Sequence, residues 1–225
     1  MTCRPARQTV RLSGTLITPR HLQEEPIMAD AQTMQAYAEN IEAYKSLVGE
    51  MPENPHLENF VSYLAAGADI LDFGCGVGNS AAKMRDKGFS MTCMDASHDM
   101  INAAAELHGL EVIQQNFSDL DAAQAFDGIW ACYSLLHAPK AEMPGNLDRI
   151  VTALRPNGIL YIGLKLGDKE QRDAVGRFYA YYTEDELSGL LRAAGLVILD
   201  CRIDQSRGLL GKMDKGLHMI AKRPA

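Results

Sequence analysis

The sequence predicts an α/β protein with a doubly wound, mostly parallel sheet, and three observations support this. Short apolar runs of strand length alternate with helical patterns over most of the chain. Strands that alternate with helices pair in parallel through right-handed crossovers. A chain of 225 residues is long enough to bury the core of one such domain. Because no repeat or linker is evident, we expect a tail over residues 1–28 and one domain over residues 29–225, with cap helices over residues 29–66.

The expected elements follow from the spacing of apolar residues. Strands are expected over residues 69–73, 89–94, 110–115, 128–132, 159–164, 196–203 and 217–221, with the last two paired as a hairpin. Helices are expected over residues 30–48, 55–65, 79–87, 99–107 and 183–191. A further helix carries Leu147, Ile150, Val151 and Leu154, and it is expected to end before the turn signature Pro156-Asn157-Gly158.

Capping residues indicate where several of these helices begin and end. Asp30 and Ser97 have the side-chain oxygens that suit an N-cap. Thr183 and Glu186 have the spacing of a capping box. Gly109 is expected to stop the helix before it, because glycine tolerates the left-handed conformation that ends many helices.

The first 28 residues differ in composition from the rest of the chain. Arg4, Arg7, Arg11 and Arg20 all precede the first acidic residue. This composition resembles a transit peptide, but the segment is short and contains prolines. We therefore expect a disordered tail, or a start codon set upstream of the true start at Met28.

Charge and composition exclude several classes of partner. The net charge of -7 disfavours a broad nucleic-acid-binding face. No apolar stretch reaches the length needed to cross a membrane. The cysteines are scattered without metal-ligand spacing, which suits a reducing cytoplasm and predicts neither a disulfide framework nor a metal site. They are Cys3, Cys75, Cys93, Cys132 and Cys201.

The most informative stretch is a glycine-rich segment at residues 70–79, with the sequence ILDFGCGVGN. An apolar run ends in an acid, and Gly74, Gly76 and Gly78 then alternate with other residues before a helical pattern begins. Glycines suit a tight turn because they tolerate positive φ and let a ligand approach the backbone. The free N–H groups of the first helical turn would face that ligand.

Two acidic residues decide which ligand this turn favours. Asp95 ends the next apolar run, at the spacing that places a carboxylate on ribose hydroxyls. The dinucleotide fingerprint would require a glycine at Asn79. Asp72 would repel a pyrophosphate but would attract an ammonium group, directly or through water.

The string Asp-x-Gly-x-Gly-x-Gly, followed by Met94-Asp95-Ala96-Ser97-x-x-Met100, resembles motif I and the next acidic position of class I S-adenosylmethionine-dependent methyltransferases. The resemblance extends over residues 34–222. It implies a Rossmann-like sheet of seven strands in the order 3-2-1-4-5-7-6, with strand seven antiparallel. It also implies S-adenosylmethionine as cofactor and methyl transfer as the reaction.

The same resemblance implies a set of cofactor-binding residues. The turn would hold the methionyl part, Asp95 the ribose, and the residues after the third strand the adenine. Asn116 departs from the acid that the family often has there. Tyr37 and Tyr44 lie on one helix face, where either core packing or cofactor contact would explain them. The full set is Asp72, Gly74, Cys75, Gly76, Gly78, Asn79, Asp95, Ala96, Met100, Asn116, Phe117, Cys132, Tyr37 and Tyr44.

Candidate catalytic and acceptor-binding residues follow the fourth and fifth strands. His137 lies where related enzymes commonly have a histidine, and it is either a general base or a structural residue of the loop. Tyr133 would border the point of transfer. An aromatic and basic segment after the fifth strand forms either an acceptor pocket or an aromatic plug. Its candidate residues are Lys165, Arg177, Tyr179 and Tyr182.

We therefore expect a cytoplasmic methyltransferase that acts on a small molecule and is a monomer or homodimer. A protein or RNA methyltransferase would need a recognition domain or a basic groove. Methylation of base amines is disfavoured because residues 131–134 read ACYS where such enzymes have an Asn/Asp-Pro-Pro-Tyr motif. A non-catalytic module that binds S-adenosylmethionine remains an alternative, as does, more weakly, a nicotinamide oxidoreductase. The loop over residues 206–215 forms either a lid or a solvated turn.

Overall fold

The computed structural model describes residues 30–49, 54–207, 211 and 213–225, and the statements below concern these residues. The expected tail over residues 1–28 lies outside them, as does part of the expected lid over residues 206–215.

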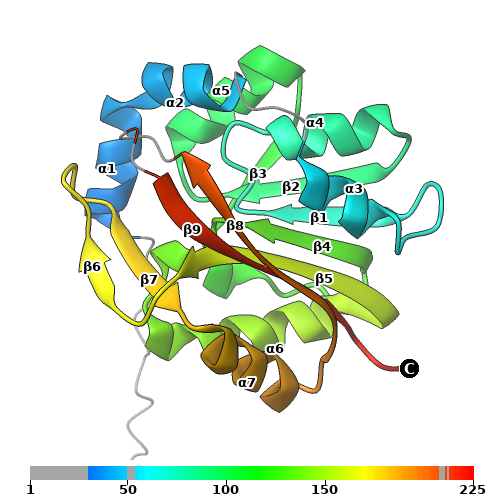
Figure 1. Ribbon diagram of the computed structural model, residues 1–225. Coiled ribbons are helices and arrows are strands. Elements are labelled where there is room, and N and C mark those ends of the chain that lie inside the picture. Colours follow the sequence, from blue (N-terminus) through cyan, green and yellow to red (C-terminus); the bar gives the residue numbers. More distant parts are fainter. Residues whose placement is uncertain (1–29, 50–53, 208–210, 212) are drawn as a thin grey trace, which may run out of the picture.

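A mostly parallel sheet forms the centre of the fold, with nine strands among the described residues, and seven of these lie in the order β3-β2-β1-β4-β5-β9-β8 (Figure 1). Strand β9 is antiparallel to both of its neighbours, β5 and β8. The strands from β3 to β5 in this order all pair in parallel. This confirms the expected order and the expected antiparallel strand. The strands are β1 Asp69–Phe73, β2 Ser90–Asp95, β3 Val112–Gln114, β4 Phe126–Cys132, β5 Leu154–Leu166, β8 Val197–Arg207 and β9 Met213–Lys222.

Helices cover both faces of this sheet (Figure 1). On one face, α6 and α7 pack on side chains such as Leu71 and Ile129. On the other, α3 and α4 pack on Ile70 and Trp130, because successive residues of a strand point to opposite faces. The α-helices are α1 Ala31–Glu39, α2 Ile41–Gly49, α3 Pro55–Val61, α4 Asn79–Asp86, α5 His98–His108, α6 Met143–Ala153 and α7 Glu184–Ala193, with short 3-10 turns η1 Phe117–Asp119, η2 Leu135–His137 and η3 Lys140–Glu142.

The prediction of a single helix over residues 30–48 is wrong in one respect, because the helix is broken at Asn40 into α1 and α2. The Asn40 backbone has φ -118° and ψ 20°, and its N–H donates to the Tyr37 carbonyl. Its side-chain amide donates to the Ala36 carbonyl at 2.8 Å. Asparagine side chains compete for backbone hydrogen bonds in this way and so favour helix ends.

The helix expected to include Leu154 ends one residue earlier, at Ala153. Leu154 begins β5 instead, where it is paired with Phe126 of β4. The turn signature at residues 156–158 becomes an irregularity inside the strand, and Asn157 adopts a φ of +67° there. A residue that precedes proline disfavours the helical conformation, which explains the early end.

A hairpin that the sequence did not predict follows β5. It consists of β6 Glu170–Arg172 and β7 Phe178–Tyr182, which pair antiparallel. The β7 strand runs parallel to the last residues of β5, where Lys165 is paired with Tyr181. Helix α1 lies beside this hairpin, because the Thr33 hydroxyl accepts a hydrogen bond from the Phe178 N–H at 2.8 Å (Figure 1).

A substitution at Gly78 tests how tightly the glycine turn packs on α5. It caps α4 with a φ of +82°, and a Cβ there would lie 2.5 Å from Leu110 Cδ1. We expect Gly78→Ala to lower the free energy of unfolding by about 1–3 kcal/mol more than Gly88→Ala. Gly88 has a φ of +90° but open space around its Cβ position, so that variant shows the backbone strain alone. Equal losses in urea denaturation would contradict the packing role.

Candidate active site

A large cavity of about 1140 Å³ lies at the carboxyl ends of β1, β2, β4 and β5. Open α/β sheets bind ligands at this edge, near the point where the strand order reverses. Residues of α1 and α2 and of the β6–β7 hairpin also line it. The predicted site residues that line it are Tyr37, Tyr44, Asp72, Gly74, Cys75, Gly76, Asn79, Asp95, Ala96, Met100, Asn116, Phe117, Cys132, Tyr133, His137, Lys165, Arg177 and Tyr179.

Two predicted residues lie outside this lining. Gly78 packs against α5, as described above. Tyr182 is fully buried in the core, and the Lys140 ammonium lies 4.9 Å from its ring centroid. The geometry therefore gives both residues a packing role.

The glycine turn is locked onto the end of β2 by backbone hydrogen bonds. The Gly74 and Cys75 N–H groups both donate to the Met94 carbonyl, at 2.8 and 3.0 Å. Gly74 has a φ of +81°, and a Cβ there would lie 2.4 Å from Ser134 Cβ, so only glycine fits. A hydrogen bond to Cys93, together with burial, raises the pKa of Cys75, which disfavours the reactive thiolate.

Asp72 is a buried carboxyl on the wall of the cavity. It is 3% exposed, and its Oδ2 has no hydrogen-bond partner among the described residues. Burial raises its pKa well above the usual range, opposed by a hydrogen bond from the Ala81 N–H. Because a buried charge needs a partner, this side chain fits a ligand that carries a cationic group.

Asp95 is held at the end of β2 by two backbone donors. Its Oδ2 accepts from the Gly76 N–H and its Oδ1 from the Ser97 N–H, both at 2.8 Å. Burial raises the pKa of Asp95, and these N–H groups lower it. Each carboxylate oxygen retains a further lone pair, so the side chain can accept two hydroxyl hydrogen bonds from a ligand.

Polar side chains around the turn also hold the neighbouring elements. The Asn79 amide donates to the Val48 carbonyl at 3.2 Å, and its Oδ1 lies 2.8 Å from His108 Nε2. Asn116 donates from both its backbone N–H and its side-chain amide to Asp119 Oδ2, at 2.9 and 3.2 Å. These contacts fix the two asparagines at the cavity wall.

Tyr37 and Tyr44 close the cavity from the side of α1 and α2. Their rings meet edge to face with centroids 5.4 Å apart. The Tyr44 hydroxyl lies 3.7 Å from the position that a Cβ on Gly76 would occupy, so the aromatic ring covers the glycine turn.

Both ring nitrogens of His137 are engaged within the protein. Nδ1 lies 2.7 Å from the Phe178 carbonyl and must donate to it, which leaves Nε2 to accept from the Tyr37 hydroxyl at 2.9 Å. Burial lowers the pKa of His137 to about 4. This geometry supports the structural interpretation of His137 and makes it a poor general base.

The cations predicted to bind the acceptor are neutralised by nearby acids. Arg177 pairs with Asp173 at 2.6 Å, and its guanidinium lies 5.2 Å from the Tyr37 ring centroid. Lys165 pairs with Asp214 at 2.8 Å and lies 3.9 Å from the Tyr179 ring centroid. The aromatic segment is therefore both a cavity wall and a seal, and it offers no unpaired cation at these two positions.

A group of three polar side chains that the sequence does not indicate also lines the cavity. His56, Asp204 and His218 line it, and their ligand atoms lie within 4.8 Å of one another. No spacing in the sequence indicates this, because the three residues come from the start of α3 and from two strands far along the chain. Only the register of β8 with β9, in which Asp204 pairs with Gly216, brings Asp204 beside His218.

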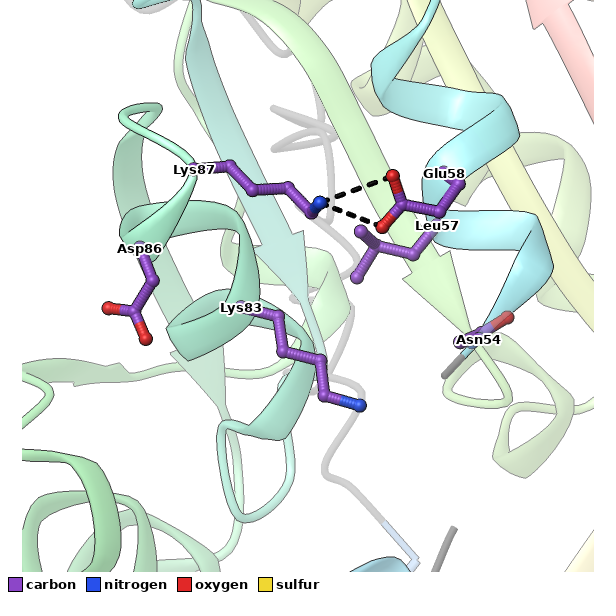
Figure 2. A pocket seen from close by; sticks show the side chains of 6 residues that line it. All are labelled: Asn54, Leu57, Glu58, Lys83, Asp86 and Lys87. Atoms are coloured by element: carbon purple, nitrogen blue, oxygen red, sulfur yellow. Dashed lines mark hydrogen bonds and ion pairs between the residues drawn. The ribbon is translucent and has the colours of Figure 1, made fainter. Parts of the chain in front are cut away.

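A second, smaller hollow of about 270 Å³ lies on the surface between α3 and α4. Figure 2 shows its lining side chains, with the Lys87 ammonium against the Glu58 carboxylate at 2.9 Å. These exposed charges satisfy each other. The candidate active site is therefore the large cavity and not this hollow.

Comparison with known proteins agrees with this geometry. A family model described as a methyltransferase domain matches residues 44–200, which is more than two thirds of the chain. The chain belongs to this methyltransferase family. The cofactor of the family is S-adenosylmethionine, as the resemblance in the sequence implied.

One curated relative is the O-methyltransferase resE of Aspergillus sclerotiorum, 32% identical over 153 residues, which are 60% of this chain and 57% of that protein. The chain spans about half to three-fifths of the length of the curated relatives it matches. In the described part of the chain, no helix combines the length and apolar character that a membrane crossing requires.

Solved structures share the fold of this chain. A Burkholderia thailandensis 1,6-didemethyltoxoflavin-N1-methyltransferase with bound S-adenosylhomocysteine matches with a TM-score of 0.73 and 24% identity, over 87% of this chain and 88% of that chain. The [4+2]-cyclase SpnF matches with a TM-score of 0.68 and 21% identity, over 89% and 98%. Because a cyclase shares this fold, the fold does not by itself fix the reaction.

We expect the buried Asp72 carboxyl to lower the free energy of unfolding of the ligand-free protein, because no ligand cation is present to pair with it. Its raised pKa means that the free energy of unfolding falls as pH rises from the unfolded pKa of about 3.9 to the folded pKa. We expect Asp72→Asn to raise the free energy of unfolding of the ligand-free protein by about 1–2 kcal/mol at neutral pH. This increase in the free energy of unfolding should become smaller as the pH is lowered.

Urea denaturation at neutral and acid pH measures this difference, with the exposed Asp121→Asn as control. A variant that is less stable than the wild type at neutral pH would contradict the unpaired state of Asp72.

Proposed function

We propose that this protein transfers a methyl group from S-adenosylmethionine to a small-molecule acceptor held in the cavity. The observation that carries the proposal is a pair of carboxyl groups beside the glycine turn, the buried Asp72 and the half-buried Asp95. A cationic ligand without phosphate suits this arrangement, because carboxylates attract an ammonium group and repel a pyrophosphate.

The residues around the turn fit the parts of this cofactor. Asp72, with its unpartnered oxygen, would take the ammonium group. Asp95 would accept the two ribose hydroxyls, because its backbone donors already fix its orientation. Asn116 and Phe117 would border the adenine, with Met100 as a polarizable partner for the ring.

The cavity can hold the cofactor and a small acceptor together. Its volume of about 1140 Å³ exceeds the usual range for small-molecule sites, about 300–1,000 Å³. Its cations at Lys165 and Arg177 are paired with acids, so the acceptor side is predominantly aromatic. The O-methyltransferase activity named for the Aspergillus relative supports an oxygen acceptor.

The protein would contribute mainly alignment and the exclusion of water. The cofactor, when bound, supplies a methyl group on a sulfonium that is already activated. Holding acceptor and donor in line can lower the barrier by about 7–11 kcal/mol. The cover formed by Tyr37 and Tyr44 would keep water from the transfer point.

Calorimetric titration with S-adenosylmethionine tests the cofactor site. Asp95→Ala should weaken binding by about 1.5–3 kcal/mol, because it removes charge-assisted hydrogen bonds. This corresponds to a Kd increase of roughly 10- to 150-fold. The exposed Asp121→Ala is the matched control, and equal affinities for both variants would remove Asp95 from the site.

Release of S-adenosylhomocysteine in the presence of candidate acceptors tests the reaction. A methyltransferase forms this product only when an acceptor is present. Tight binding of the cofactor without turnover of any acceptor would favour a non-catalytic binding module. Tight binding of NAD, with none of S-adenosylmethionine, would overturn the proposal.

A further inference from the structure

Strand β8 is a long edge of the central sheet. It spans 11 residues, Val197–Arg207, and in the described part of the chain it pairs with β9 alone. The strands at the other edges, β3 and β6, have 3 residues each. An edge strand presents unpaired N–H and C=O groups, and proteins limit this exposure by keeping such strands short. The length of β8 therefore leaves a row of backbone groups with which a further strand can pair.

Exposed apolar side chains gather along this edge. Large apolar side chains are exposed at seven positions among the described residues, and four of these positions lie on β8 and β9. Three are on β8 itself, where Val197 is 53%, Leu199 38% and Ile203 49% exposed. Unpaired backbone beside exposed apolar side chains favours association with another chain.

Polar side chains of β8 lie on the face of the sheet that α3 covers. The Asp200 carboxylate accepts a hydrogen bond from the Asn59 amide at 2.6 Å, and Asp204 Oδ2 lies 2.7 Å from His56 Nε2. Arg202 lies between these two acids on the same face, because every second residue of a strand does so. Its Nε donates to Asp200 at 2.8 Å. The strand thus carries an acid, a base and an acid at alternate positions.

Apolar side chains of the same segment lie on the opposite face. Cys201 packs against the core that α7 covers, and Ile203 shares this face. The ladder of β8 with β9 is irregular between Ile198 and Asp200 and regular from Asp200 to Arg207. The regular segment is the better part of the edge for adding a strand, because a bulge bends its strand and leaves a residue unpaired.

Symmetry limits how two copies of this segment can face each other. Two identical antiparallel strands in one sheet are related by a two-fold axis perpendicular to the sheet, as in a closed dimer. Because opposite residues of an antiparallel pair lie on the same face, the axis passes through a residue that faces itself. Residues at equal distances on either side of the axis then face each other.

An axis at Ile203 gives favourable contacts along the regular segment. Arg202 then faces Asp204 of the second copy, and the symmetry forms this pair twice. Ile203, whose apolar side chain is exposed, faces its own copy. Opposite charges and apolar pairs stabilise antiparallel strands, whereas like charges destabilise them. An axis at Arg202 or at Asp204 would set like charges against each other, and an axis at Cys201 would carry the ladder into the irregular residues.

Both charged side chains of this pair are available to a second copy. The Arg202 side chain is 50% exposed, and its bond to Asp200 uses Nε, whereas a guanidinium has four further N–H donors. The Asp204 side chain is 40% exposed, and its partners among the described residues are His56 and His218. Burial lowers the pKa of His218, so this ring is neutral near pH 7. A guanidinium from a second copy would give Asp204 a permanently charged partner.

We propose that two copies of this chain join along β8 in antiparallel, with the two-fold axis at Ile203. The central sheets of both copies form one continuous sheet, and two Arg202–Asp204 pairs flank the axis. The edge favours a second copy over an unrelated strand, because its charges complement each other about the axis. The joined edge also borders the candidate active site, because Asp204 and Gln205 line the cavity. In this register Cys201 of the second copy faces Gln205, so each copy stands beside a wall of its partner's cavity.

Analytical ultracentrifugation of the full chain at micromolar concentration tests the pairing. We expect the wild type to sediment with twice the mass of the chain. Ile203→Lys sets two ammonium groups against each other on the axis and should raise the dimer Kd by about 100-fold or more, because like charges across an interface are strongly unfavourable. Val197→Lys is the matched control, since it makes the same change on the same strand but outside the paired segment. It should leave the dimer intact.

A cysteine on the axis tests the register. Ile203→Cys, in a background with Cys3→Ser and Cys201→Ser, sets two thiols opposite each other with a Cα separation of about 4.5–5.5 Å. This separation lies within the range of a disulfide. With oxidised glutathione as the oxidant, we expect a covalent dimer on a non-reducing gel. Leu107→Cys, at an exposed position of α5, is the control in the same background and should remain a single chain.

Each other outcome overturns the proposal. A wild type that sediments as a single chain would show that the charges of β8 guard the edge against pairing. A dimer that persists in Ile203→Lys would have its interface elsewhere. A dimer lost equally in Val197→Lys, or one without a disulfide in Ile203→Cys, would refute the register. Circular dichroism and thermal unfolding show whether each variant is folded, and the cysteine variant tests the register even where the lysine variant is not.

Discussion

The hydrogen bonds between the Asp95 carboxylate and the backbone of the glycine turn organise the whole site. Asp95 ends β2, and it holds Gly76 and Ser97 by their N–H groups. Because β1 and β2 are parallel neighbours, this contact fixes the turn after β1 against the start of α5. The acidic side of the cavity, with Asp72 and Asp95, is therefore fixed by the backbone of the sheet. The aromatic side, with Tyr37 and Tyr44, belongs to α1 and α2.

Charge is distributed unevenly around the cavity, with an excess of acidic side chains. The acids at the strand ends are the half-buried Asp95 and the buried Asp72, and an oxygen of Asp72 has no partner among the described residues. Two cations of the lining are instead paired, Lys165 with Asp214 and Arg177 with Asp173. An excess of negative charge in a buried site favours a cationic ligand. The side chains of His56, Asp204 and His218 line the same cavity.

The sequence predicted the parts of the molecule that depend on local patterns. The glycine turn and the position of Asp95 follow from apolar spacing and short motifs, and the strand order follows from the family that these motifs resemble. The break at Asn40 depends on one side-chain hydrogen bond, and the hairpin ending at residues 178–182 pairs with the far end of β5. Asp204 and His218 meet only through the long-range register of β8 with β9, so no spacing in the sequence indicated them.

A crystal structure of the protein with S-adenosylhomocysteine tests the central claim most directly. We expect the ligand's ammonium group beside Asp72, directly or through one water, and both ribose hydroxyls on the Asp95 carboxylate. The glycine turn should keep the backbone conformation described here. A ligand bound elsewhere, or one whose ammonium group lies away from Asp72, would contradict the account.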